Sequence, residues 1–495
     1  MGIVGKKGLS ITLVSFVGVV IGAFNTMIVF PRVLGAEKYG LVVLILSIAS
    51  IIAQFAHLGV PNTIIRFFPY LKLKKKFIYR FALQVPLISL LVLGFLFFLF
   101  GANLFEAYVK KNQLFNEYQP VILPLAASLV FFEVLLSIAR SELKPILPAV
   151  LREILLRLLT LFLLVLFFFQ SISFNTFMLS WIGLYSFNVF LLCVSLLSTG
   201  LFKFKFGFPI FPDASFASKM INYGFVTVLT SSAAILVNKI DVLMLGYYLK
   251  IENIAFYTIA FFMASLIQIP ARSILQIVTP LLSKAWVEND ANEIFNLYRK
   301  TALNQMMIGL LLFIGIWMNL DDILLFVSEE YGGIKMVFFY IGLAKLLDVS
   351  TGANGTIIAT SNKFKFDLYI NLFLVLVVIG TNIVFIPRYG ITGAAMATAL
   401  SLFVHNCIKT SFVYLFFNIQ PFSVNTVKLL AIALFTYCIL LQVPFYKIES
   451  DLLRILIRSV CTGLLFMVPT LIFKVSEDLN SYLKNIIRTA ANQKK

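Results

Sequence analysis

Apolar residues fill long runs from one end of the chain to the other, and charged residues, Pro and Gly separate these runs. A bilayer core about 30 Å thick needs about 20 apolar residues per helical crossing, and the runs have this length. The pattern therefore predicts an all-α polytopic membrane protein with about fourteen transmembrane helices. The predicted spans are 9–30, 41–63, 77–100, 119–139, 148–169, 175–199, 220–246, 254–280, 301–320, 335–359, 366–386, 391–417, 426–446 and 453–473.

The order of spans and turns repeats once along the chain. Leu34-Gly35, followed by a charged turn, has a counterpart in Leu245-Gly246, and the segment 139–144 has one in 359–364. Repeated units with an even number of spans give parallel halves, with a transport site between them. We therefore expect an N-terminal lobe at 1–205 and a C-terminal lobe at 206–420, each with six helices. Two extra spans and a cytoplasmic tail follow at 421–495.

The composition agrees with a membrane protein, since 60% of residues are hydrophobic and only 13% are charged. The formal net charge of +18 would suggest nucleic acid in a soluble protein, but Lys and Arg also gather in cytoplasmic loops of membrane proteins. Roughly 25 Lys and Arg fall in alternate predicted loops and about 9 in the others. The loop around Asp321, Asp322, Glu329 and Glu330 is acidic and belongs to the second set. We expect both termini in the cytoplasm and no nucleic-acid partner.

No catalytic or cofactor motif stands out. The chain has no phosphate-binding Gly-x-x-x-x-Gly-Lys-Ser/Thr loop, no His-Glu-x-x-His and no Gly-x-Ser-x-Gly sequence. We therefore expect no cofactor, no metal and no enzymatic activity. The chain itself is therefore predicted to carry no ATP motor.

The most specific string is Ile386–Thr398, Ile-Pro-Arg-Tyr-Gly-Ile-Thr-Gly-Ala-Ala-Met-Ala-Thr. Pro387 and Gly390 predict a tight turn, and the small residues after them predict close helix packing. The string resembles one in bacterial polysaccharide flippases of the multidrug/oligosaccharidyl-lipid/polysaccharide exporter superfamily. The turn after Val33-Leu34-Gly35 and the segments Asp241–Gly246 and Pro280–Ser283 resemble that family in the same order.

The resemblance implies a fold and a function. The fold would be two six-helix lobes around a central cavity, with two further C-terminal helices. The protein would flip a polyprenyl-diphosphate-linked oligosaccharide from the inner to the outer leaflet of the bacterial cytoplasmic membrane by alternating access. Its partners would be this lipid, membrane lipids, and a polysaccharide polymerase or other proteins of the pathway.

A diphosphate headgroup would need cations in the cavity, and ionisable residues within spans cost about 2.5–3.5 kcal/mol each. We therefore select Arg66, Lys239, Arg272 and Lys345 as candidate substrate-binding residues. Arg66 could instead be one of the basic residues that commonly flank a span on its cytoplasmic side. Lys239 could extend its ammonium group to the membrane interface.

Four further charged residues are candidates for ion coupling or charge pairing, namely Asp241, Asp348, Glu133 and Arg140. Glu133 and Arg140 are seven residues apart and share a helix face, as Glu153 and Arg157 do at four, so we expect each couple to pair internally. Lys239 and Asp241 face different directions, and Asp348 lies on a face similar to that of Lys345.

Two other functions stay open. A cation-coupled multidrug exporter would share the fold but would favour carboxylates in the cavity. A membrane polysaccharide polymerase or ligase would need a large outer loop with catalytic groups, and the predicted outer loops are short.

Overall fold

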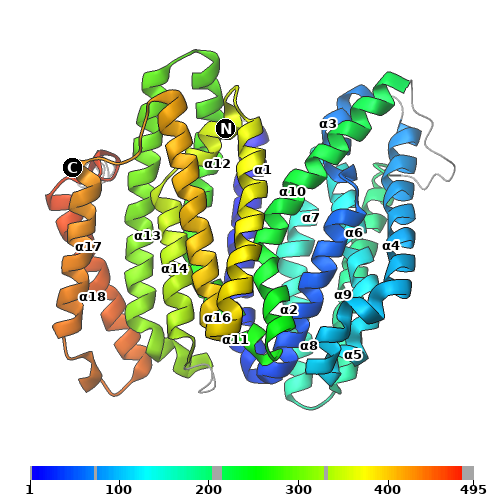
Figure 1. Ribbon diagram of the computed structural model, residues 1–495, viewed down its shortest axis with the longest axis horizontal. Helices are drawn as coiled ribbons and strands as arrows, with labels where there is room; N and C mark the ends of the chain where they lie inside the picture. Colours follow the sequence, from blue (N-terminus) through cyan, green and yellow to red (C-terminus); the bar gives the residue numbers. More distant parts are fainter. Residues whose placement is uncertain (1–2, 72–74, 203–213, 328–332, 482–495) are drawn as a thin grey trace, which may run out of the picture. The chain divides into compact units, whose positions relative to one another are not determined.

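The computed structural model describes residues 3–71, 75–202, 214–327 and 333–481, with side chains from residue 13 onward and without those of residues 75–76. The regular structure of these ranges is helical, with no strand (Figure 1). Many helices are long and apolar enough to cross a membrane. The chain is therefore an all-α multi-pass membrane protein, as the hydrophobic pattern predicts.

Contacts along the chain define two compact units, Met1–Thr258 and Ile259–Lys495. Helix α10 belongs to the first unit because it packs against α2 and α3. The division into lobes at residues 205 and 420 stays a prediction. The helices of the first unit are α1 (Ile3–Phe24), α2 (Phe30–Ala56), α3 (Val60–Leu71), α4 (Lys75–Lys111), α5 (Gln113–Tyr118), α6 (Ile122–Ser141), α7 (Ile146–Val150), α8 (Leu156–Phe168), α9 (Phe174–Ser198) and α10 (Ala214–Tyr248).

Helix α11 (Glu252–Ser265) leads from the first unit into the second. The remaining helices are α12 (Ile269–Val287), α13 (Ala291–Val327), α14 (Lys335–Ser350), α15 (Asn354–Thr360), α16 (Lys365–Phe417), α17 (Val424–Gln442) and α18 (Asp451–Ile472). Short π-helical turns join α1 to α2, at η1 (Asn25–Val29), and α7 to α8, at η3 (Leu151–Leu155). Single 3-10 turns lie at η2 (Gln119–Val121), η4 (Leu266–Gln268) and η6 (Phe445–Lys447).

Two helical stretches are too long for one crossing. Leu13–Leu71 has 59 residues and Lys365–Phe417 has 53, which at 1.5 Å per residue is roughly 80–90 Å if straight. Each is interrupted by a glycine with positive φ, Gly35 at 72° and Gly390 at 60°. The described residues contain 10 apolar spans, or 11 with the bent pair α14–α15. If these two stretches are each divided and α7–η3–α8 is counted as one crossing, the number is the predicted fourteen.

The break at Gly390 turns α16 back on itself as a hairpin. Thr381 Oγ1 lies 3.0 Å from Ser401 Oγ, and His405 Nε2 lies 3.1 Å from Asn371 Oδ1 on the opposite arm. Gly390 has φ 60° and ψ −135°, which glycine adopts without the steric cost that a Cβ would bring. Ala394, Ala395 and Ala397 are fully buried just after the turn. The predicted turn and close packing are both confirmed.

A second break separates α2 from α3 at Leu58 and Gly59, which both have positive φ. A Cβ on Gly59 would lie only 2.4 Å from the carbonyl oxygen of Gly224 in α10. The absence of a side chain therefore lets α10 approach this break closely. Pro61 follows in the first turn of α3, where its missing N–H costs nothing.

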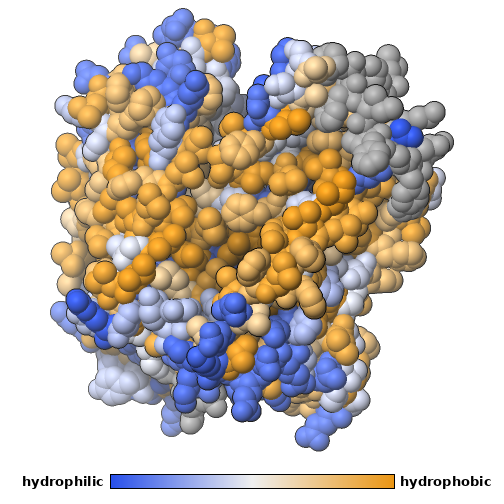
Figure 2. Space-filling model, turned by 45° about the vertical axis from the view of Figure 1, so that its right-hand side comes forward, coloured by the Kyte–Doolittle hydropathy of each residue, from blue (hydrophilic) through white to orange (hydrophobic). Residues whose placement is uncertain are grey.

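The surface matches a lipid environment. Large apolar side chains such as Phe98, Leu376 and Val427 are exposed, and Figure 2 shows hydrophobic side chains over the middle of the helices with hydrophilic ones toward their ends. Within the second unit, α17 and α18 pack on α13 through a core that includes Leu429, Leu440 and Phe466. The two predicted extra helices therefore form part of the second unit.

Candidate functional site

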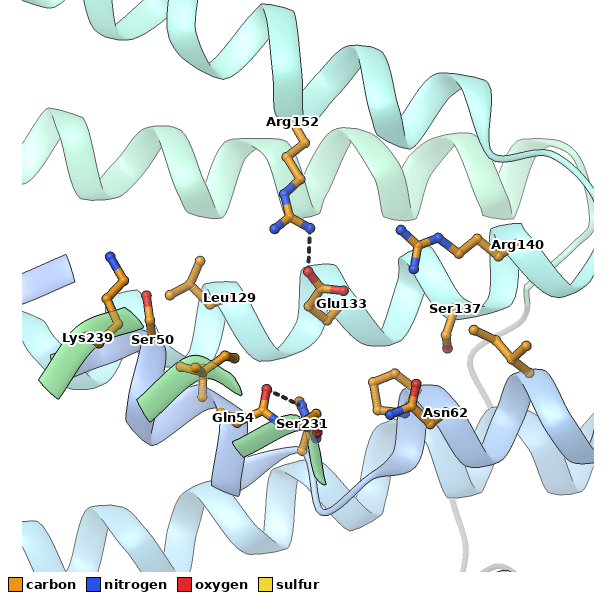
Figure 3. Close-up of a pocket in the computed structure, with 15 residues that line it drawn as sticks. Ser50, Gln54, Asn62, Leu129, Glu133, Ser137, Arg140, Arg152, Ser231 and Lys239 are labelled. Carbon is orange, nitrogen blue, oxygen red and sulfur yellow. Dashed lines mark hydrogen bonds and ion pairs between the residues drawn. The ribbon is translucent and has the colours of Figure 1, made fainter. Parts of the chain in front are cut away.

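A cavity of about 400 Å³ lies within the first unit. Helices α2, α3, α6 and α10 and the π turn η3 supply its walls (Figure 3). The lining residues are Ser50, Ala53, Gln54, His57, Pro61, Asn62, Ile65, Leu129, Glu133, Ser137, Arg140, Arg152, Ser231, Ile235 and Lys239.

Helical periodicity places these residues on common faces. On α6 the lining positions are Leu129, Glu133, Ser137 and Arg140, and on α10 they follow every fourth residue from Ser231 to Lys239. Residues three or four apart share one helix face, so each wall is one such face. Along each of these helix faces, polar side chains recur at intervals within segments that are otherwise apolar.

The charged groups form a row along the cavity. Figure 3 shows Lys239 and Arg140 toward its two ends, with Glu133 and Arg152 between them. Arg152 Nη1 lies 2.5 Å from Glu133 Oε1. No ion pair involves Arg140 or Lys239 within the described part of the chain. With three cations and one carboxylate, the cavity is suited to an anionic group.

The predicted pairing of Glu133 with Arg140 is wrong, because Glu133 pairs with Arg152 instead. The two residues share a face of α6, but seven residues of helix separate them by about 10 Å along the axis. Arg152, which reads as a loop charge in the sequence, is carried into the cavity by η3.

The π turn sends two adjacent side chains to different places. Arg152 lines the cavity, whereas Glu153 pairs with Arg157 at 2.7 Å. That second pair packs against α1, where Gly18 and Gly22 leave room for it. The predicted Glu153–Arg157 pair is confirmed, and π turns often mark functional positions in helices.

A chain of hydrogen bonds links the α2–α3 break to α10. The Gly59 backbone N–H donates to His57 Nδ1 at 3.1 Å, so His57 Nε2 carries the proton and donates to Gln54 Oε1 at 3.3 Å. Gln54 Nε2 donates to Ser231 Oγ at 2.5 Å, and Ser231 donates to the backbone of α10. His57 is thus a buried, hydrogen-bonded histidine.

Two other predicted site residues of the first unit lie outside this cavity lining. Arg66, on α3, is exposed, and its guanidinium carbon lies 4.2 Å from the ring centroid of Tyr223. Asp241 is buried and accepts a hydrogen bond from the Tyr257 hydroxyl. Lys239 and Asp241 therefore face different surroundings, as their spacing predicts.

In the second unit, Lys345 is buried on α14, with its ammonium 4.9 Å from the ring centroid of Phe261. Asp348 accepts hydrogen bonds from Gln268 Nε2 at 2.6 Å and Asn406 Nδ2 at 3.0 Å. Arg272, on α12, is exposed. The burial of Lys345 agrees with its predicted position deep in a span.

The structure adds charged residues that sequence reasoning missed. Lys409, buried within α16, lies 3.0 Å from Asp367 on the opposite arm of the hairpin. The sequence did carry a signal for this pair, because Lys409 lies within a long apolar run and Asp367 lies on the other side of the predicted turn. Within the described residues, no group of three or more His, Cys, Asp or Glu side chains could hold a metal ion.

The predicted acidic outer loop is corrected at Asp322. This residue is buried at the end of α13, and its carboxylate accepts Arg454 Nε at 2.9 Å and Arg458 Nη1 at 2.7 Å from α18. Asp321 is largely exposed and pairs with Lys335. Glu329 and Glu330 lie outside the described residues.

Comparison with known sequences points to surface glycans. The sequence model of a family described as polysaccharide biosynthesis proteins matches residues 4–286. The chain is 23% identical over 284 residues to a "Probable low-salt glycan biosynthesis flippase" of Haloferax volcanii, covering 56% of this chain and 58% of that protein. It is 26% identical over 135 residues to a capsular polysaccharide biosynthesis protein of Staphylococcus aureus, covering 27% and 34% of the two chains. The chain thus matches less than two thirds of either relative.

Solved structures show the same fold. An inward closed lipid II flippase superposes with a TM-score of 0.76 at 16% identity, over 94% of this chain and 98% of that one. An inward-facing multidrug resistance transporter of the MOP superfamily gives a TM-score of 0.62 at 16% identity, over 81% and 94%. At these identities the likeness is one of fold alone.

Proposed function

Since the chain belongs to the polysaccharide biosynthesis protein family, we propose that it moves a polyprenyl-diphosphate-linked oligosaccharide from the inner to the outer leaflet. It does so by alternating access in a bacterial cytoplasmic membrane. The similarity to a glycan biosynthesis flippase and the fold shared with a lipid II flippase support this proposal. A polysaccharide polymerase or another protein of the same pathway would receive the product.

One observation carries the proposal, namely the row of cations in the first-unit cavity. Guanidinium groups bind phosphate oxygens through two parallel hydrogen bonds, and an ammonium adds a compact point charge. Arg140, Arg152 and Lys239 supply both kinds of group. With the N-terminus in the cytoplasm, the C-terminal end of α6 and Arg140 lie toward the inner leaflet, where the headgroup would enter.

The other selected cations extend this scheme. Arg66, at the same end of the first unit as Arg140 in the predicted topology, would meet the headgroup first. Lys345 and Arg272 are the candidates of the second unit for binding a headgroup. Asp241, which accepts a hydrogen bond from Tyr257, and Asp348, which accepts hydrogen bonds from Gln268 and Asn406, would serve in ion coupling.

The test is reconstitution of the full-length protein in liposomes with a fluorescent polyprenyl-diphosphate sugar. We expect Arg140→Gln/Arg152→Gln to lower the flipping rate at least about tenfold, because charge-assisted contacts are the strong ones. The matched control, Lys284→Gln/Lys300→Gln, removes two exposed cations outside the cavity lining and should flip normally.

Arg272→Gln/Lys345→Gln tests the second unit in the same assay. Normal flipping by the Arg140→Gln/Arg152→Gln protein would remove the cavity from the mechanism. Normal flipping by the second double variant would remove only Arg272 and Lys345.

A cation-coupled multidrug exporter is the second candidate, because a multidrug transporter shares the fold. The cavity argues against it, since cationic drugs need carboxylates and here cations outnumber the single Glu133. Drug sensitivity of a deletion strain, compared with loss of its surface glycan, separates the two functions.

A further inference from the structure

Glu133 is the single carboxylate among the lining residues of the cavity, and it lies at the middle of the cationic row. Its Oε1 contacts Arg152 Nη1 at 2.5 Å. An anion that moves from Arg140 toward Lys239 must therefore pass the one guanidinium that already has an internal anionic partner.

The Glu133–Arg152 ion pair contributes little to the stability of the fold, so Arg152 can exchange Glu133 for another anion. The side chains of Arg152 and Glu133 are 50% and 35% exposed, and ion pairs this accessible contribute little to stability. The contrast is Asp322, only 10% exposed and held by two guanidinium groups. Arg152 can therefore leave Glu133 for another anion at small cost.

A transporter needs binding that is strong enough for entry and weak enough for release. Three cations without an opposing charge would hold a diphosphate too tightly for rapid passage. A carboxylate that competes with the diphosphate for the central guanidinium lowers that affinity at mid-cavity.

We infer that Glu133 is a release residue, an internal competitor of the substrate diphosphate for Arg152 that limits how long the headgroup stays in the cavity. This inference rests on the proposed function. Glu133 then sets the balance between affinity and turnover, and the ligand it opposes is a diphosphate group.

Glu133→Gln tests this role because it keeps the size and shape of the side chain and removes its charge. The probes are farnesyl diphosphate and inorganic diphosphate, titrated by calorimetry into the full-length protein in nanodiscs. We expect farnesyl diphosphate to bind about 5- to 20-fold more tightly. In liposomes, the flipping rate at saturating lipid should fall by a similar factor.

Glu153→Gln is the matched control, because it removes an Arg-paired carboxylate that does not line the cavity. It should bind and flip like the unmodified protein. In an Arg152→Gln background, Glu133→Gln should give a much smaller gain in affinity, since residues in direct contact are not additive.

Unchanged or weaker diphosphate binding by Glu133→Gln would overturn the inference, as would an equal gain in the Arg152→Gln background. Faster flipping by Glu133→Gln would also overturn it. Failure of the proposed function looks different, because the unmodified protein would then bind no diphosphate and flip no lipid. Equal gains with both probes identify the headgroup alone as the ligand, and a gain with farnesyl diphosphate only shows that the lipid chain takes part.

Discussion

Charged side chains that are neighbours in this sequence can differ widely in how far they are buried. Asp322 is 10% exposed and joins Arg454 and Arg458 of α18, whereas its neighbour Asp321 is 70% exposed and pairs with Lys335 alone. Breaking a buried pair leaves an uncompensated charge, which costs far more than losing a surface pair. Two adjacent aspartates therefore make a matched experiment.

Asp322→Asn should destabilise the protein by about 3–5 kcal/mol, because two guanidinium groups lose their shared carboxylate. Asp321→Asn should cost at most about 1 kcal/mol. Thermal unfolding of both variants in the same detergent measures the difference. Equal melting temperatures would contradict the assignment of Asp322 as the ionic link between α13 and α18.

Sequence reasoning at this scale succeeded for partners one helical turn apart, and it failed for Glu133 and Arg140, which lie two turns apart on α6. The Glu153–Arg157 pair follows from a spacing of four residues. The Glu133–Arg152 and Asp322–Arg458 pairs do not, because each joins segments whose adjacency is set by packing. A charge count near a predicted loop also could not show that Asp322 turns inward.

Helix α10 approaches the α2–α3 break of the first unit closely. Gly59 has φ 71°, and a Cβ there would lie 2.4 Å from the Gly224 carbonyl oxygen. Gly183, inside α9, has nothing within 4 Å of such an atom. One substitution at each position separates a required glycine from a replaceable one.

Gly59→Ala should lower stability by about 2–4 kcal/mol, from the left-handed backbone and from displacement of α10. Gly183→Ala should raise stability by up to about 1 kcal/mol, since alanine loses less chain entropy in a helix. Thermal melting in detergent is again the measurement. A neutral Gly59→Ala would show that α10 can move away from the break without cost.

The pattern of apolar runs predicts most helices but not their limits or kinks. Pro387 and Gly390 signalled the α16 turn, because both residue types punctuate helices. The break at Leu58 and Gly59 was missed, because both residues lie inside the predicted span 41–63. Helix α4 runs to Lys111, beyond the predicted end at residue 100, because its polar end continues the helix past the apolar run.

For the molecule as a whole, the orientation in the membrane is a sequence prediction that still needs a test. The bias of Lys and Arg toward alternate loops places the α12–α13 connection inside and the α17–α18 connection outside. Glu288 and Glu449 are exposed in these two connections. A label that cannot cross the membrane can therefore test both.

In a background with Cys193, Cys407, Cys438 and Cys461 replaced by serine, Glu449→Cys should react with an impermeant maleimide in intact cells. Glu288→Cys should react only after the membrane is opened. Labelling after denaturation controls for the amount of each protein. The reverse pattern would invert the topology and place Arg140 toward the outer leaflet.

The fold class and the polysaccharide biosynthesis family could be predicted from the chain alone, because hydropathy and a few ordered motifs carry them. The cavity could not, since it needs one face from each of several helices. Lys239 and Arg140 were identified as charges in spans, but their membership in one row with Arg152 depends on the packing of α2, α6 and α10.

The polar contacts inside the α16 hairpin bear on how the protein is made. Asp367 and Asn371 on one arm are matched by Lys409 and His405 on the other. Either arm alone in hydrocarbon would expose these groups unpaired, at a cost of a few kcal/mol per charge. The turn at Gly390 brings the second arm out of the ribosome directly after the first. We therefore expect lateral release from the translocon to follow synthesis of both arms, with residues 365–417 entering the bilayer as a single unit of biogenesis.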